Sequence, residues 1–160
     1  MKQKFGRVLH LGIVVEDLKK AVKVYEQEMG VGPWQITEHQ PFFADKLVND
    51  GVGMDFACGL FKGDGYEIEL IQPVGPSVFR EFLETHGPGV HHVVLENHQR
   101  YTDVLEMARR VSGRGPALSV RFPDGTPIVF YADMLKETGL LLEVGNNDPR
   151  PERKGENHEN

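Results

Sequence analysis

The sequence predicts an α+β fold made of two tandem βαβββ modules. An apolar strand that carries a histidine occurs twice, as VLHLGIVV near the N-terminus and as GVHHVVLEN later. Each of these strands is followed by a segment with the apolar spacing of an amphipathic helix. Each half then closes with an apolar strand interrupted by a carboxylate, EIELIQP in the first half and GLLLEVG in the second. Repetition of the whole order carries more weight than any single element.

Both helices have start and stop signals at their ends. Asp17 is a suitable N-cap for the first helix, and Gly30 is a suitable stop. Asn97 lies near the start of the second helix, where it is a candidate cap, and Gly113 follows its end. The apolar stripe consists of Leu18, Ala21, Val22, Tyr25 and Met29 in the first helix and of Tyr101, Val104, Leu105 and Ala108 in the second.

Between each helix and its carboxylate strand there is room for two more strands. These are PWQITEH and GVGMDFACGLF in the first half, and ALSVRFP and TPIVFYAD in the second. A connecting segment has the pattern of a short helix, with Ser77 as its cap, Phe79, Phe82 and Leu83 facing inward, and Gly87 at its end. The predicted organisation is a first module over residues 1–75, a connecting helix over 76–88, a second module over 89–146, and a polar, disordered tail over 147–160.

Composition limits the classes of function. The chain has 160 residues, 39% hydrophobic and 26% charged, which is typical of a globular protein. A net charge of −6 with scattered basic residues argues against a nucleic-acid partner. The one cysteine, Cys58, lies in an apolar strand and is predicted to be an inert buried thiol. With neither a membrane-length apolar run nor a signal-peptide pattern, we expect a cytoplasmic protein that acts on a small molecule.

Four polar residues interrupt the apolar strands, and together they predict a metal site. His10 and His92 lie in the first strand of each half, whereas Glu69 and Glu143 lie in the last. A carboxylate in a buried strand is costly unless a positive charge meets it. Two imidazoles and two carboxylates form a complete ligand set for one divalent cation.

Strand parity places these side chains. His10 shares a face with Gly12, whereas the neighbours on either side of His10 are leucines that pack on the helix. The His10 face therefore lines a concavity that the curved sheet encloses, and Gly12 leaves space there. Parity selects His92 rather than His91 as the ligand, and makes His91 either helix-facing or a neighbour of the ligands. Glu67 shares a face with Glu69, as a solvated edge charge or as a catalytic group.

Several segments resemble the vicinal oxygen chelate superfamily. They are HLGIVVEDLKKAVKVYEQEMGVG, IELIQP, PSVFREFLETHGPGVHHVVLE and GLLLEVG, and the likeness covers roughly residues 8–145. The stretch FLETHGPGVHH is similar to the branch that holds methylmalonyl-CoA epimerase and glyoxalase I-related proteins. Members have paired βαβββ modules that curl around one divalent metal, and they often form homodimers. The resemblance implies that His10, Glu69, His92 and Glu143 bind zinc, cobalt, nickel, manganese or iron.

The resemblance also implies a reaction. A metal of this kind stabilises an enediolate that forms when a proton is removed next to a carbonyl, as in an epimerase, an isomerase or a glyoxalase-type lyase. The base is Glu143 or Glu69 in a glyoxalase-like mechanism, or a separate carboxylate such as Asp55 in an epimerase-like one. The chain lacks the His-Pro-Lys stretch usual in epimerases and the Asp-Pro-Asp-Gly turn usual in glyoxalase I, which leaves the substrate open.

Candidate substrate-binding residues surround this site. Trp34 and Phe43 are candidates for a substrate mouth, although aromatic residues beside Gly and Pro equally serve as loop anchors. Arg121 is a candidate for binding a carboxylate, with an ordinary surface arginine as the alternative. Tyr131 precedes the last ligand strand and is expected to shape the pocket. The substrate is expected to be a thioester or another carbonyl or carboxylate compound.

Two other functions stay open. The first is a small-molecule binding or resistance protein of the same fold, although such members commonly lack the ligands. The second is an extradiol-type dioxygenase, which uses two histidines and one carboxylate on iron. The fourth predicted ligand, Glu69, argues against that geometry.

Overall fold

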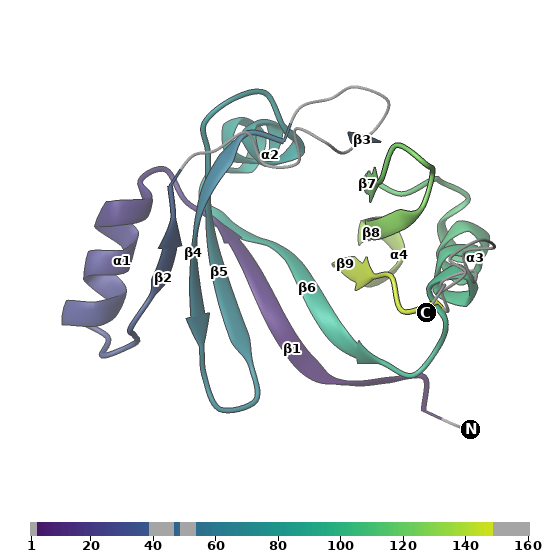
Figure 1. Ribbon diagram of the computed structural model, residues 1–160, viewed down its shortest axis with the longest axis horizontal. Coiled ribbons are helices and arrows are strands. Elements are labelled where there is room, and N and C mark those ends of the chain that lie inside the picture. The colour runs from purple at the N-terminus through teal and green to yellow at the C-terminus, as the bar shows by residue number, and fades with distance from the viewer. Residues whose placement is uncertain (1–2, 39–46, 49–53, 149–160) are drawn as a thin grey trace, which may run out of the picture.

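A computed structural model describes residues 3–38, 47–48 and 54–148. Within these ranges the chain forms one nine-stranded sheet with four helices packed around it (Figure 1). The strand order is β2-β4-β5-β1-β6-β9-β8-β7-β3. In chain order the elements are β1 (Phe5–Val14), α1 (Leu18–Gln27), β2 (Gln35–Thr37), β3 (Leu47–Val48), β4 (Phe56–Lys62), β5 (Glu67–Pro73), α2 (Val78–His86), β6 (Gly89–Asn97), α3 (Tyr101–Ser112), β7 (Leu118–Arg121), β8 (Pro127–Met134), α4 (Leu135–Thr138) and β9 (Leu140–Gly145).

The two predicted modules are confirmed as the two halves of this sheet. The first strand of each half lies parallel to the last strand of the same half, so that β1 pairs with β5 and β6 with β9. The halves join through antiparallel pairing of β1 with β6 at the centre. The sequence did not predict α4, and it did not predict β3, which lies in the first half of the chain but pairs with β7 of the second.

The sheet curves into an arch, with α1 and α3 outside its two flanks and α2 near the upper rim (Figure 1). On the flank of the first module, Leu18 and Val22 of α1 pack on Leu70, as the stripe predicts. On the other flank, α3 packs on β8 and β9. The concave side holds a third cluster that joins both modules through the α2 residue Phe79, which is 1% exposed. The apolar interior therefore fixes how far apart the two halves stand.

The N-terminal ends of the helices follow the predicted caps in two of three cases. Asp17 accepts a hydrogen bond from the backbone N–H of Lys20, and Ser77 accepts one from that of Arg80. Asn97 does not cap α3, because its side chain accepts from the N–H of Gln99 in the preceding turn. Instead Asn147 accepts from the N–H of Tyr101 at 2.8 Å, and so takes the place of a local cap.

The predicted tail is therefore joined to the fold at its first residues. Asp148 also accepts a hydrogen bond from the N–H of Thr102 at 3.3 Å, so that two residues of the predicted tail serve as a cap for α3. Residues 149–160 lie outside the described part of the chain. Among the helices that are described, none has the length and apolar character needed to cross a membrane.

Candidate metal centre

The two predicted histidine ligands come from the two strands at the centre of the sheet. His92 on β6 lies directly opposite Gly12 on β1, and His10 lies opposite Val94. A Cβ atom on Gly12 would stand only 1.9 Å from Cε1 of His92, so the imidazole fills the space that glycine leaves. The rings of His10 and His92 then stack with their centroids 5.5 Å apart. Both rings thus occupy the same face of the sheet, as strand parity predicts.

The two predicted carboxylates reach this histidine pair from the neighbouring strands. On β5, Glu69 lies opposite Gly12 of β1, and on β9, Glu143 lies opposite Val94 of β6. Oε2 of Glu143 is 2.9 Å from Nε2 of His92. Oε2 of Glu69 is 3.3 Å from Nε2 of His10 and 4.0 Å from Nε2 of His92. All four side chains therefore face one another across the central strands.

The donor atoms fit a divalent cation. The Nε2 atoms of His10 and His92 are both buried, and neither has a directed hydrogen bond within the described part of the chain. One ligand atom each from His10, His92 and Glu143 lies within 4.8 Å of the others. Since such ligands stand about 2.0–2.2 Å from a metal, neighbouring ligand atoms are expected roughly 3–4 Å apart. Glu69 falls outside this tighter group but stays close to both imidazoles.

The charges in the site are coupled. Burial on its own lowers the pKa of His10, but the close contact with Glu69 and the negative charges of Glu69, Glu143 and Glu67 outweigh it and raise the pKa. Burial on its own raises the pKa of Glu143, but the close contact with His92 and the charges of His92 and His10 outweigh it and lower the pKa. The hydroxyl of Tyr131 has a pKa well above its usual range because it is buried and lies beside Glu143. Tyr131 therefore stays neutral in the site.

Tyr131 is the predicted substrate residue that lies within the cluster. It stands directly opposite Glu143 in the β8–β9 ladder. Its ring stacks on that of His92, with centroids 4.7 Å apart and an interplanar angle of 22°. The residue is 5% exposed, so it forms a wall of the site. Tyr131 is not among the residues that line the two cavities beside the histidines, and its role in shaping a substrate pocket stays a prediction.

Each histidine also has a neighbour at its second ring nitrogen. Nδ1 of His10 lies 3.7 Å from Oε2 of Glu67. The other carboxylate oxygen of Glu67, Oε1, lies 3.6 Å from Nζ of Lys62. Nδ1 of His92 lies 3.1 Å from Nδ1 of His91. Burial, followed by the charge of His92, lowers the pKa of His91 to about 3, so its imidazole is neutral.

A β-bulge explains the position of His91. The register passes from Gly12–His92 to Ile13–Val90, so His91 is an extra residue on β6. A bulge redirects a side chain away from simple alternation. The ring of His91 consequently packs against Phe79 and Tyr131 on the side of the ligands. His91 is therefore a neighbour of the ligands and also faces a helix, the connecting helix α2.

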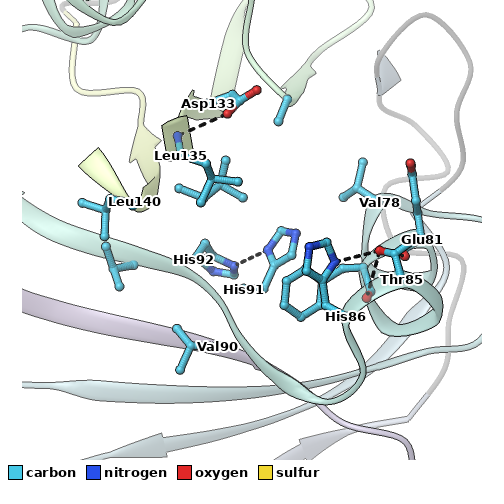
Figure 2. A pocket seen from close by; sticks show the side chains of 15 residues that line it. Val78, Glu81, Thr85, His86, Val90, His91, His92, Asp133, Leu135 and Leu140 are labelled. Carbon is cyan, nitrogen blue, oxygen red and sulfur yellow. Dashed lines mark hydrogen bonds between the residues drawn. The ribbon is translucent and has the colours of Figure 1, made fainter. Parts of the chain in front are cut away.

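Two cavities adjoin the histidines. One, of about 580 Å³, is lined by His10, Glu67 and Glu143 together with the basic residues Arg7 and Lys62. The other, of about 380 Å³, lies between α2 and the α4–β9 region and is lined by His91 and His92 amid mostly apolar side chains (Figure 2). Glu67 and Glu143, but not Glu69, are among the residues that line the first cavity.

Three other predicted site residues lie away from the cluster. Asp55 precedes β4, five residues from Leu60, the partner of Glu69, which is about 16 Å along a strand. Trp34 donates a hydrogen bond to the carbonyl of Val31 and packs with the outer α1 cluster, which matches the loop-anchor alternative. Arg121 ends β7 beyond a bulge, opposite Pro127, four residues from Tyr131 along β8. Phe43 lies outside the described residues.

The sequence interpretation missed the basic residues and the role of the bulge. Arg7 and Lys62 border the larger cavity because the β4–β5 hairpin reaches over the start of β1, where Nη1 of Arg7 lies 3.1 Å from the position of a Cβ on Gly65. The Gly-Asp-Gly hairpin signal at 63–65 was visible in the sequence. Its distance from β1 in three dimensions was not.

Comparisons with known proteins agree with this architecture. A model of the glyoxalase/bleomycin resistance protein/dioxygenase superfamily matches residues 9–130. A search of curated proteins found no match. One similar solved structure is a hypothetical protein from Bacillus halodurans, with 18% identity and a TM-score of 0.56 over 91% of this chain and 97% of that one. A second is methylmalonyl-CoA epimerase from Mycobacterium tuberculosis, with 21% identity and a TM-score of 0.56 over 93% of each chain. A third is a Streptomyces coelicolor methylmalonyl-CoA epimerase variant bound to 2-nitronate-propionyl-CoA, with 22% identity and a TM-score of 0.53 over 87% of this chain and 95% of that one. At these identities the structures show a common fold. Since the family model spans most of the chain and the fold agrees, this protein belongs to the glyoxalase/bleomycin resistance protein/dioxygenase superfamily.

Proposed function

We propose that the protein is a divalent-metal-dependent enzyme that moves a proton at the carbon next to a carbonyl group. The observation that carries this proposal is the pair of buried Nε2 atoms of His10 and His92, which lack directed hydrogen bonds and face carboxylates. In the proposal His10, His92 and Glu143 hold the cation, and Glu69 lies close enough to join them. A bound cation would supply a Lewis acid that stabilises negative charge on a substrate oxygen.

The cavity beside the carboxylates is the proposed substrate site. His10 and Glu143 line it together with the exposed basic residues Arg7 and Lys62. Basic side chains attract a carboxylate or phosphate group. A similar solved structure contains an acyl-CoA analogue. We therefore propose a carbonyl substrate with a negatively charged portion, with an acyl thioester as the first compound to test.

Glu69 is the proposed proton acceptor. Glu143 is in the tighter ligand group, and His92 holds the pKa of its carboxyl low, which makes it a weak base. Glu69 lies outside that group, 3.3 Å from His10, and its side chain is 21% exposed. A carboxylate that is not fully committed to the cation can take a proton from a substrate and return it. Tyr131, which is 5% exposed, stacks on His92 and covers one face of its ring.

The test combines metal analysis with hydrogen exchange. Purified protein is assayed for bound divalent ions by mass spectrometry, and 2-methylacyl-CoA thioesters and hemithioacetals are then screened for deuterium uptake from D₂O. We expect exchange that EDTA abolishes and added metal restores. Glu143→Gln should lose the cation, whereas Glu69→Gln should keep most of it and lose exchange. His98→Gln changes an exposed histidine away from the cluster and should match the wild type.

The outcomes separate the parts of the proposal. A wild-type protein that binds no divalent ion contradicts the metal site. A protein that binds one but exchanges no proton with any of these substrates keeps the site and loses the reaction. Equal ion content and equal exchange in Glu143→Gln and the wild type contradict the role of Glu143.

One observation favours a second candidate. The tighter group contains two histidines and one carboxylate, the ligand set of non-haem iron oxygenases. Under that alternative Glu69 does not bind the ion, and Fe²⁺-loaded protein consumes oxygen in the presence of a catechol. An oxygen-electrode measurement with Fe²⁺ and then Zn²⁺ distinguishes the two, because zinc does not support oxygen activation.

A further inference from the structure

His92 is the most constrained residue of the candidate centre. Its side chain is 0% exposed and lies over Gly12, where no Cβ atom could fit beside it. Tyr131 stacks on one side of the ring at 4.7 Å. These contacts hold the ring in one orientation, in which each of its nitrogens faces a neighbour. Nε2 faces Glu143 and Nδ1 faces His91.

The two nitrogens of a neutral imidazole have opposite roles. One carries the proton and donates, whereas the other has a lone pair and accepts or binds a metal. If Nε2 of His92 gives its lone pair to a cation, the proton must be on Nδ1. Nδ1 of His91, at 3.1 Å, must then accept that proton in a hydrogen bond. This in turn requires His91 to be neutral and to carry its own proton on Nε2.

We infer that His91 is a positioning residue, which accepts a hydrogen bond from Nδ1–H of His92 and thereby fixes the tautomer in which Nε2 of His92 is free to bind the cation. The inference rests on the proposed metal site. Partners of this kind orient metal-binding histidines and strengthen their binding. His10 is held differently, since Nδ1 of His10 has Glu67, a half-exposed carboxylate 3.7 Å away, as its neighbour.

The connecting helix α2 holds His91 in place. Phe79 and Phe82, both on α2, meet the ring of His91 edge to face, with centroids 5.0 Å away in each case. Figure 2 shows His91 between His92 and the end of α2 that bears His86, with the hydrogen bond between the two adjacent histidines drawn. The bulge turns the ring of His91 onto this side of the sheet, and α2 keeps it there. The helix that joins the two modules thus braces one metal ligand through His91.

Two variants of His91 separate hydrogen bonding from packing. His91→Phe keeps a ring against α2 but has no acceptor. His91→Asn has an oxygen on Cγ, at the place where histidine has Nδ1, and can accept the same hydrogen bond. Zinc affinity is measured by competition with a chromogenic chelator, together with the melting temperature of the zinc-free protein. His98→Gln serves as the matched histidine control.

We expect His91→Phe to bind zinc about 10–100-fold more weakly than the wild type, the usual loss for such a partner. His91→Asn should recover most of that affinity, and His98→Gln should lose none. In zinc-loaded wild-type protein, long-range ¹H–¹⁵N spectra of the imidazoles should show His92 protonated on Nδ1 and His91 protonated on Nε2 alone. This assignment of protons would not follow from a purely structural role for His91.

A proton on Nδ1 of His91 in the zinc-loaded protein would overturn the inference, as would equal zinc affinity of His91→Phe and wild type. If His91→Phe does not fold, the wild-type spectrum decides by itself. If the wild type binds no zinc or other divalent ion, the proposed metal site fails and the inference fails with it. A wild type that binds zinc with the wrong tautomer of His92 removes only the role of His91.

Discussion

Replacing Gly12 with alanine tests how the candidate centre is built. The added methyl carbon would stand 1.9 Å from Cε1, 2.3 Å from Nε2 and 2.4 Å from Nδ1 of His92. Ordinary contacts of a Cβ atom begin near 3.4 Å, so the ring or the strand must move by about 1.5 Å. The ring of His92 is 0% exposed and stacks on Tyr131, so a shift of the ring breaks its contacts with Tyr131 and Glu143.

The cost has two parts. Overpacking of a well-filled site destabilises a protein by about 1–3 kcal/mol. Metal–ligand distances tolerate only about 0.2 Å, so a shift of the ring on the order of 1 Å should weaken zinc binding at least tenfold. We expect both losses in Gly12→Ala, measured by urea unfolding of the zinc-free protein and by chelator competition.

Gly89→Ala is the matched control for this experiment. Gly89 begins β6, the strand that carries His92, and a Cβ atom there would meet nothing within 4 Å. It should keep the stability and the zinc affinity of the wild type to within about 0.5 kcal/mol. If Gly12→Ala is as stable as Gly89→Ala and binds zinc as tightly, His92 does not lie over Gly12, and the proposed arrangement of ligands is wrong.

Three further results are expected. Burial lowers the pKa of His91 from 6.5 to about 3, so between these pH values the unfolded state binds a proton that the native state excludes. The free energy of unfolding in EDTA should therefore fall as the pH drops from 6.5 toward 3. His91 contributes at most about 1.4 kcal/mol per pH unit to the slope of the free energy of unfolding against pH. Urea unfolding at a series of pH values should show a shallower slope in His91→Asn than in the wild type, and equal slopes would contradict the burial of His91. Ser77→Ala should cost about 1 kcal/mol in urea unfolding, since it removes the cap of α2, and no loss would mean that the hydrogen bond to Arg80 does not stabilise the helix. Cys58, whose buried thiol has a pKa raised to about 11, should react with a thiol reagent only after unfolding, whereas a fast reaction in the native protein would contradict its burial.

Local patterns were enough to predict most of the elements. The stripe from Leu18 to Tyr25 predicted α1 because a helix packed on a sheet needs apolar side chains on one face, whereas Met29, the last predicted member, lies beyond the helix and is 59% exposed. Asp17 and Ser77 cap their helices as predicted, since an N-cap depends only on residues within one turn. Asn97 failed as a cap because the N-terminus of α3 is capped from Asn147, far along the chain. Such a partner leaves no local trace in the sequence.

Trp34 and Asp55 show a related limit of sequence reasoning. Asp55 was proposed as a base from the family resemblance and Trp34 as part of a substrate mouth, yet Trp34 packs on the outer cluster of α1 and Asp55 precedes β4 at a distance from Glu69. Whether a residue near a strand faces the cleft depends on the length and register of the strand. These are set by pairing with other strands, and a shift of one residue reverses the face.

The sequence by itself determined the repeated order of elements and the four residues that meet at the centre of the sheet. Period-2 alternation records which side chains leave a strand on the same face, and it held for His10, Glu69, His92 and Glu143. Only the tertiary structure decided the place of His91, because a bulge in β6 breaks that alternation and α2 then fixes the displaced ring. The physical reason is that alternation is local, whereas a bulge is a response to pairing with β1 and to packing against a helix from between the modules.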